Sequence, residues 1–490
     1  MRRYAALAPA ALVVAVVVGV ASASHGGTRT EKRPYLVPTA EGLAAGVRIE
    51  KILSTGDLVH GYQMSGIPDG LGAYKGHGRS DDDDDDDGGR RGGRFTVVMN
   101  HELGKTFPGQ PTGVDARISR LEISRDFRVH DATYLFTGAE GFERFCSSTL
   151  RVINGKPYYF TGEEAVDAGH DGSSIVMNAR TGQWWETPHF GHFQHENVVP
   201  LRLKQWVFLS SEDDFRVTPV RHASYLYAYI APSFWGAVSG TQGDLYVWKA
   251  DNDAKTGNAT VVKGESVPGH FVRIDQSKNQ NSMMLKTAAN DSRAFQFDRL
   301  EDVAVHGDKD GRVYIADTGK PPVTARGRIY QFDFDRRDPT KATLKMILNA
   351  DPPDNDNFAN PDNMDASERV LVFQEDREAA FRGDYSYVLT YRFPNGPLTR
   401  VARVDPTPPI LPGAWESSGV IDARHVLGRD WWLLDVQTHG QFTLQPGAAP
   451  PGVQPPPNTG TGEDGQLLAI KIPGSQGGGD GDDDDDDDDD

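Results

Sequence analysis

Carboxylates repeatedly follow short runs of strand-forming residues in this 490-residue chain. In VLVFQEDRE, five mostly apolar residues that begin at Val370 lead directly into Glu375 and Asp376. Similar strand ends carry Asn100-His101-Glu102, Glu163-Glu164, Glu212-Asp213-Asp214 and Asp317, and related polar clusters are His195-Glu196, Glu301-Asp302 and Asp362-Asn363. Carboxylates leave water reluctantly. Their recurrence after β-like segments therefore indicates that the acids have a common task.

Cations are the most direct way to make such a set of carboxylates stable in one place. Repelling acids either take up protons or are neutralised by metal ions, and these motifs carry no matching row of lysines or arginines. Oxygen ligands favour hard ions, so calcium or ferric iron suits this set better than zinc. The alternative for any single acidic pair is an exposed strand end.

Strand geometry leaves open which member of each pair binds. Successive side chains of a strand point to opposite faces, so Glu375 and Asp376 cannot both face one site while the strand continues. The same ambiguity applies to Glu163 and Glu164.

Histidine and cysteine offer two competing sites. His189, His192 and His195 could ligate zinc, but His192 and His195 would face opposite sides of an extended strand, which favours His195 as a hydrogen-bonding neighbour of Glu196. Cys146, the single cysteine, is either a small buried hydrophobe or a thiolate ligand, and a thiolate beside carboxylates favours iron. One cysteine also excludes an intramolecular disulfide.

The elements that would position these residues are predicted to be many short strands. Segments such as GRFTVVMNHEL, KQWVFLSSEDD and GRVYIADTG each open on a turn residue and continue with alternating aromatic or β-branched residues. Many short strands with few helices predict an all-β, six-bladed β-propeller with inserted loops and a few short helices, because radial blades avoid long free edges. A double β-sandwich is the structural alternative.

In such a propeller the innermost strands end around one axial mouth. Carboxylates that are distant in sequence would therefore meet there. No G-x-S-x-G, P-loop or H-E-x-x-H pattern occurs, so the chemistries that depend on those motifs have no support.

The formal charge of -19 comes mostly from two aspartate runs. Seven aspartates at residues 81–87 and ten in the C-terminal tail leave the remainder of the chain close to neutral. The sequence has no basic stripe, so we expect no nucleic-acid partner.

The N-terminus predicts export. MRRYAALAPAALVVAVVVGVASAS has basic, apolar and small-residue regions in the order of a signal peptide, which we assign to residues 1–23. An uncleaved membrane anchor is the alternative, but the apolar run is short for a spanning helix. We expect a secreted or extracytoplasmic monomer without a membrane span once the signal is removed.

Residues 24–473 are predicted to form a single propeller domain. A Gly- and Asp-rich insertion at about 76–93, a Pro-rich stretch near 446–465 and an acidic tail at 474–490 are predicted to be disordered, because they cannot bury enough apolar surface.

Taken in order, several motifs resemble the PhoX-type alkaline phosphatases. They are MNHEL, FCSS followed by YYFTGEE, HFGHFQHENVVPL, RLEDVAV, NPDNMDAS, VFQEDRE, WESSGVIDARHVLGRDWWLLDVQTHG and GQLLAIKIP, from about residue 95 to 473. The resemblance implies a six-bladed propeller that hydrolyses phosphate monoesters outside the cytoplasm, with iron (Fe³⁺) and calcium (Ca²⁺) at the axial mouth.

The resemblance also implies residue roles. Arg299 would face phosphate and Glu301 would face metal, and both are candidate catalytic residues. The candidate metal ligands, from the motifs and the strand ends together, are Cys146, Glu163, Glu164, Glu196, Glu301, Asp362, Asn363, Glu375 and Asp376.

This chain departs from the family pattern at Gly162, where many members have a second cysteine, and it has a shortened Cys146-to-Glu164 segment. Two other functions fit the same sequence. They are a non-catalytic, calcium-stabilised propeller that binds a protein or glycan, and a phosphodiesterase or phytase-like enzyme on the same scaffold.

Overall fold

A computed structural model describes most of the chain outside its two termini. The described residues are 33–76, 93–104, 115–166, 169–214, 223–307, 309–319, 326–377, 384–405, 415–439 and 463–477. The predicted signal peptide, most of the predicted insertion, most of the Pro-rich stretch and most of the acidic tail lie outside these ranges.

Two four-stranded antiparallel sheets come early in the chain. The first contains β5 (Pro68–Lys75), β6 (Arg94–His101), β7 (Arg117–Ser124) and β8 (Val129–Phe136). The second contains β9 (Phe145–Ile153), β10 (Lys156–Glu163), β11 (Ser174–Asn178) and β12 (Trp184–Glu186). A small hairpin of β3 (Leu58–Val59) and β4 (Tyr62–Gln63) precedes them. Each sheet is ordered as the chain runs, which is the arrangement of consecutive hairpins.

The central part of the chain forms one nine-stranded sheet. Its strands are β13 (His195–Arg202), β14 (Trp206–Glu212), β15 (Leu226–Ala231), β16 (Asp244–Ala250), β17 (Ser266–Ile274), β18 (Leu300–Val305), β19 (Arg312–Asp317), β20 (Arg328–Asp335) and β21 (Asp338–Asn349). Strand β17 pairs with β16 on one side and β21 on the other, so it joins two four-stranded meanders at their outer edges.

N-terminal strands complete the last two sheets. Strand β1 (Leu36–Pro38) pairs with β25 in the sheet of β22 (Pro361–Ala366), β23 (Val370–Glu375), β24 (Tyr387–Arg392) and β25 (Leu398–Val404). Strand β2 (Arg48–Ser54) pairs with β28 in the sheet of β26 (Glu416–Asp422), β27 (Trp431–Thr438) and β28 (Asp464–Lys471). Pairing between N-terminal and late strands closes the fold, with β1 and β2 as the outermost strands of their sheets.

The short helices lie between or after strands. They are α1 (Ala40–Ala44), α2 (Phe234–Val238), α3 (Ser282–Asp291) and α4 (Arg424–Leu427), with 3₁₀ turns at Pro188–Phe190, Asn258–Thr260 and Gln276–Lys278. None of the described helices has the length and hydropathy needed to cross a membrane.

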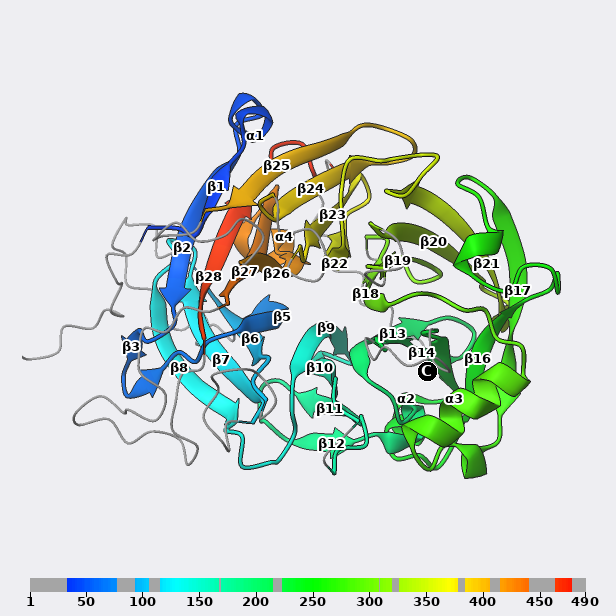
Figure 1. Ribbon diagram of the computed structural model, residues 1–490. Coiled ribbons are helices and arrows are strands. Elements are labelled where there is room, and N and C mark those ends of the chain that lie inside the picture. Colours follow the sequence, from blue (N-terminus) through cyan, green and yellow to red (C-terminus); the bar gives the residue numbers. More distant parts are fainter. Residues whose placement is uncertain are drawn as a thin grey trace, which may run out of the picture.

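The strands that begin the meanders line the centre of the molecule. Strands β5, β9, β13, β18, β22 and β26 contact one another in succession around a ring, and the other strands lie outside them (Figure 1). The predicted all-β, propeller-like fold with few helices is therefore confirmed. The described sheets of four or more strands number five rather than six, because β17 fuses two meanders into one sheet.

Hydrophobic side chains fill the spaces between neighbouring sheets. One cluster, for example, joins Leu71 of β5 to Leu433 of β27 and Leu467 of β28. Each meander thus buries both faces, and the polar ends of the central strands are left around the axis.

Close backbone approach between sheets excludes side chains at some positions. A Cβ atom at Gly162 of β10 would lie 2.2 Å from the Cβ of His195 of β13. This close approach between β10 and β13, here called the seam, leaves no space for a cysteine at position 162.

We expect Gly162→Ala to destabilise the protein by about 1–3 kcal/mol, because the added methyl group forces β10 and β13 apart. The measurement is the free energy of unfolding in denaturant. Gly93→Ala is the matched control, since a Cβ there meets no heavy atom within 4 Å. Equal stability of both variants would show that the seam relaxes without cost.

Candidate metal centre

Equivalent β-bulges in the central strands aim the candidate ligands at the axis. In each bulge, two consecutive residues of the central strand lie opposite a single residue of the partner strand. The first of these two residues is Asp69 in β5, Cys146 in β9, Glu196 in β13, Glu301 in β18, Asp362 in β22 and Gly419 in β26. A bulge re-aims one side chain out of the regular alternation, which is why adjacent residues here have different surroundings.

The second residue of these bulges binds neighbouring sheets together. Asn197 donates a hydrogen bond to Asp302, and Asp302 accepts one from the main-chain nitrogen of Met364 at 2.9 Å. Asn363 Nδ2 lies 3.3 Å from Asp69 Oδ1, and the Ser418 hydroxyl donates to Asn363 Oδ1 at 2.7 Å. This layer fixes the relative positions of the central strands.

The first residues, with side chains from following strand ends, form three groups that could each hold a cation. In each group, one ligand atom per residue lies within 4.8 Å of the others. The groups are Asp69, Glu102 and Cys146; Glu196, Glu301 and Asp362; and Asp362, Asp376 and Glu416. Because Asp362 belongs to two of the groups, those two form one continuous site, whereas the group of Cys146 shares no ligand with them.

Burial and mutual repulsion dominate the electrostatics of the centre. Burial raises the pKa of Glu196 well above its usual value, and the nearby carboxylates of Glu301 and Asp362 raise it further. Burial likewise raises the pKa of the Cys146 thiol, with Glu102 and Glu164 adding to the effect. Burial and mutual repulsion thus both disfavour the charged forms of these groups.

Two carboxylate oxygens support cation binding more directly. Glu196 Oε2 and Glu416 Oε2 are buried and accept no hydrogen bond from any described residue. A buried oxygen without a donor is costly, and a cation in the group to which each belongs would satisfy it. The residues therefore fit bound metal ions.

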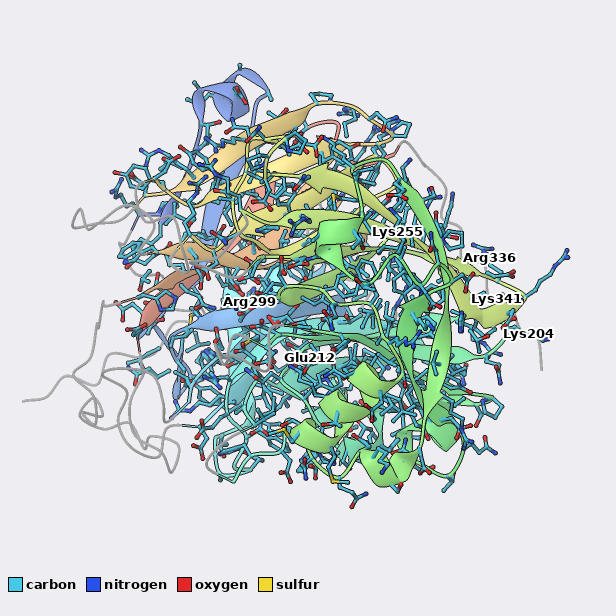
Figure 2. All side chains as sticks on the ribbon, turned by 45° about the vertical axis from the view of Figure 1, so that its right-hand side comes forward. Lys204, Glu212, Lys255, Arg299, Arg336 and Lys341 are labelled. Carbon is cyan, nitrogen blue, oxygen red and sulfur yellow. The ribbon has the colours of Figure 1, made fainter. Side chains whose placement is uncertain are left out.

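A short acidic segment after β14 organises the basic groups around the centre. Arg299 donates to both oxygens of Asp213 at 2.7 Å, and its Nη2 lies 3.0 Å from Glu301 Oε1. On either side, Asp214 and Glu212 ion-pair with the buried Lys286 of α3. Figure 2 shows Arg299 on the opposite side of the ribbon from the exposed Lys204, Arg336 and Lys341.

Cys146 and Glu416 have separate partners within the centre. The Cys146 thiol lies 3.1 Å from Glu164 Oε2, and Arg144 Nη2 donates to the main-chain oxygen of Glu164 at 2.6 Å. His439 lies between Glu416 and Glu463, at 3.1 and 2.7 Å. Although burial lowers the pKa of His439, these two partners raise it well above its usual value, so the imidazolium holds Glu416 in place.

The structure brings together most of the residues that the sequence singled out. Cys146, Glu164, Glu196, Arg299, Glu301, Asp362 and Asp376 all lie in or against the three groups.

Four of the predicted ligands lie outside the groups. One is Glu164, which contacts the Cys146 thiol without joining its group. Glu163 Oε1 accepts from the main-chain nitrogen of Glu143 at 2.8 Å and also binds His170. Glu375 forms a fork with Arg377 at 2.7 and 3.1 Å, and Asn363 belongs to the hydrogen-bonded layer beneath the groups. Strand alternation separates each of Glu163 and Glu375 from its neighbour.

The zinc alternative is not formed by the described histidines. His189 Nε2 binds the main-chain oxygen of Ala237 at 2.6 Å, and His195 Nε2 binds that of Gly191 at 3.0 Å. His192 is partly exposed and belongs to none of the cation groups.

Sequence reasoning missed Asp69 and did not select Glu102, Asp213 or Glu416 as site residues. Glu102 and Asp213 were visible as acidic strand ends, and Glu416 stands in the WESSG motif. Asp69, in IPDGLGAY, precedes the strand-forming residues rather than following them. The signal for Asp69 would have been an acid at the start of a central strand, as in Glu196 and Glu301.

Comparisons with known proteins give a structural relative only. No family model and no curated protein sequence matches the chain. Among solved structures, Pseudomonas fluorescens PhoX in complex with vanadate, a transition state analogue, is 14% identical, with a TM-score of 0.57 over 92% of this chain and 99% of that chain. This similarity establishes a shared fold.

A more remote match is the β-propeller domain of the Trilobed protease from Pyrococcus furiosus. It is 8% identical and has a TM-score of 0.29 over 71% of this chain and 88% of that chain. At that level it supports no argument about this protein.

We expect a chelator to lower the melting temperature at pH 8 by roughly 5 °C or more, because ions bound only by the folded state stabilise it. The loss should be smaller at pH 5. Carboxylates with raised pKa values hold protons in the folded state while the unfolded state releases them, so the metal-free protein loses stability as the pH rises above their usual range.

Thermal melts at both pH values, with and without chelator and after calcium is added back, measure this difference. Identical melting temperatures at pH 8 would show that protons alone neutralise the centre.

Proposed function

We propose that this protein is an exported, metal-dependent phosphatase of the PhoX type that hydrolyses phosphate monoesters. The observation that carries the proposal is the set of three cation groups around the propeller axis, two of which share Asp362, beside an arginine held by a carboxylate. The fold shared with a PhoX that binds vanadate, a transition state analogue, supports it.

The architecture we propose is a six-bladed propeller. Strands β13–β16 would form one blade and β18–β21 another, joined by β17 at their outer edges. The contacts of the central strands around a ring support this interpretation.

The donor atoms favour two kinds of ion. The group of Asp69, Glu102 and Cys146 includes a thiol, which favours iron over calcium. The two groups that share Asp362 offer only oxygens and suit calcium, which accepts oxygen ligands at flexible angles. We therefore assign iron to the first group and calcium to the other two.

Bound metal ions would supply Lewis-acid stabilisation of the negative charge that develops on the phosphoryl oxygens. The protein itself positions the substrate. Arg299 presents a planar guanidinium beside the calcium groups, and Asp213 fixes its orientation through two hydrogen bonds. Because Asp213 takes the Nε and Nη2 donors, a phosphate oxygen would be contacted through Nη1.

The remaining residues act by holding the groups in place. Glu301 contacts Arg299 and belongs to the group with Glu196 and Asp362, so it would link phosphate binding to metal binding. Glu164 lies against the Cys146 thiol, and its carboxylate can take the thiol proton when metal binds. His439 keeps Glu416 in position.

The substrate we propose is a small phosphate ester that reaches an open axial mouth. Export through the N-terminal signal and a monomeric state belong to the same proposal. Loops around the mouth would select the ester, and a panel that includes a phosphodiester separates a phosphatase from a phosphodiesterase.

We expect the mature protein to hydrolyse p-nitrophenyl phosphate and to lose at least 90% of its turnover after chelation. Restoring iron and calcium together should recover turnover more fully than either ion alone, because the donor sets differ. The measurement is the steady-state rate with metal content determined in parallel. Full turnover in the stripped protein would contradict the metal-dependent mechanism.

The variant Glu301→Gln tests the same metal site by substitution instead of chelation. It keeps the size of the side chain but removes a charge shared by metal and arginine, so turnover should fall by roughly 100-fold or more. Glu50→Gln, on an exposed strand position, is the control.

We expect Arg299→Lys to raise KM by about 10-fold and to lower kcat less. Lysine keeps the positive charge but lacks the planar guanidinium that Asp213 orients through two hydrogen bonds. Asp213→Asn should change KM in the same direction, since Asp213 orients Arg299. Steady-state kinetics with the same ester measure both. Wild-type KM in Arg299→Lys would exclude a phosphate contact by this side chain.

A further inference from the structure

A second, basic cavity lies at the other end of strand β5. Its volume is about 820 Å³, and it is lined by the last residues of β5, the first residues of β6, part of β7, Arg180 after β11 and part of α4. Cavities of this size hold small ligands.

Five cationic side chains from separate elements converge on the cavity. They are Lys75, Arg94, Arg120, Arg125 and Arg180, and Glu122 is the single carboxylate among the described lining residues. Glu122 lies 4.0 Å from Arg94, with both side chains largely exposed, so it neutralises little of this charge.

Two of the five cations donate hydrogen bonds to main-chain carbonyls. Arg120 Nη1 donates to the main-chain oxygen of Arg180 at 2.6 Å, and Arg125 Nε donates to that of Val426 at 3.2 Å. The Arg180 guanidinium lies 6.0 Å from the centre of the Tyr74 ring. A neutral carbonyl fixes a guanidinium without cancelling its charge, so the cavity keeps a positive potential.

Strand β5 separates this cavity from the metal centre. Asp69 stands near its first residue and Lys75 is its last, so six residues of extended chain place the two about 20 Å apart. The two sites therefore lie toward opposite ends of the molecule.

The lining favours a chain of phosphate groups over a nucleic acid. The rings of Tyr74 and Phe95 are buried, so His425 is the one exposed aromatic side chain among the described lining residues, which is little stacking surface for nucleic-acid bases. Phosphate groups need only charge and N–H donors, and arginine supplies both in a fork.

We propose that this cavity is an anion site that binds linear inorganic polyphosphate. Arg120 and Arg180 form its inner wall, and Lys75 and Arg94 form its exposed rim. The site does not depend on the metal centre or on the phosphatase function.

Calorimetric titration of the full-length protein with inorganic tripolyphosphate tests the proposal. We expect Arg120→Gln/Arg180→Gln to weaken binding by at least 10-fold while turnover of p-nitrophenyl phosphate stays unchanged. Lys75→Gln/Arg94→Gln, at exposed positions where folding is not at stake, should weaken binding at least 3-fold. Arg48→Gln/Arg337→Gln removes the same charge elsewhere and should have little effect.

Glu301→Gln locates the binding independently of catalysis. Binding that survives in Glu301→Gln and is lost in the rim variant supports the cavity even if no phosphatase activity exists. Binding that is lost in Glu301→Gln and unchanged in both cavity variants would overturn the proposal, because the ligand would then occupy the metal centre.

Discussion

Repulsion among buried carboxylates at the propeller axis is the constraint on which this structure depends. The groups that contain Glu196, Asp362 and Glu416 bring negative charges from distant parts of the chain within 4.8 Å of one another. In a partly buried setting that arrangement is unfavourable unless protons or cations neutralise it. Strands β1 and β2 pair with the last two sheets and so close the ring of sheets, which keeps the central strands in contact despite this repulsion.

The bulges divide adjacent residues between two tasks. In β18, Glu301 faces the axis while Asp302 accepts hydrogen bonds from β13 and β22. Burial raises the pKa of Asp302 to about 6, and its hydrogen bonds partly offset that rise. A regular strand would also point neighbouring side chains to opposite faces. The extra residue of the bulge changes these directions locally, and regular pairing with the next strand resumes after it. Metal binding and sheet packing are thus supplied by consecutive positions.

Basic groups are placed so that they orient acids without neutralising the centre as a whole. Asp213 binds Arg299, whereas Asp214 and Glu212 bind Lys286 on the far side. The opposite end of β5 has the reverse balance, with five cations and one carboxylate among the described residues around a cavity. The molecule therefore presents an acidic site that suits cations and a basic site that suits anions, about 20 Å apart along one strand.

The sequence by itself determined the class of fold and most of the chemistry of the centre. Alternating strand residues followed by acids predicted an all-β, propeller-like chain, and the acids after those strands included Glu164, Asp213 and Asp376. These features are local, because strand periodicity and turn residues are written in short segments.

Only the tertiary structure decided which member of each pair faces the axis. Glu375 precedes Asp376 by one residue, yet it is paired with Arg377, and Glu163 is bound by His170 instead of joining Glu164. Asp69 lies far from Cys146 in sequence and enters the same group only because β5 and β9 are neighbours in space. The pairing of sheets brings such residues together, and a bulge changes the direction of a side chain without a strong mark in the sequence.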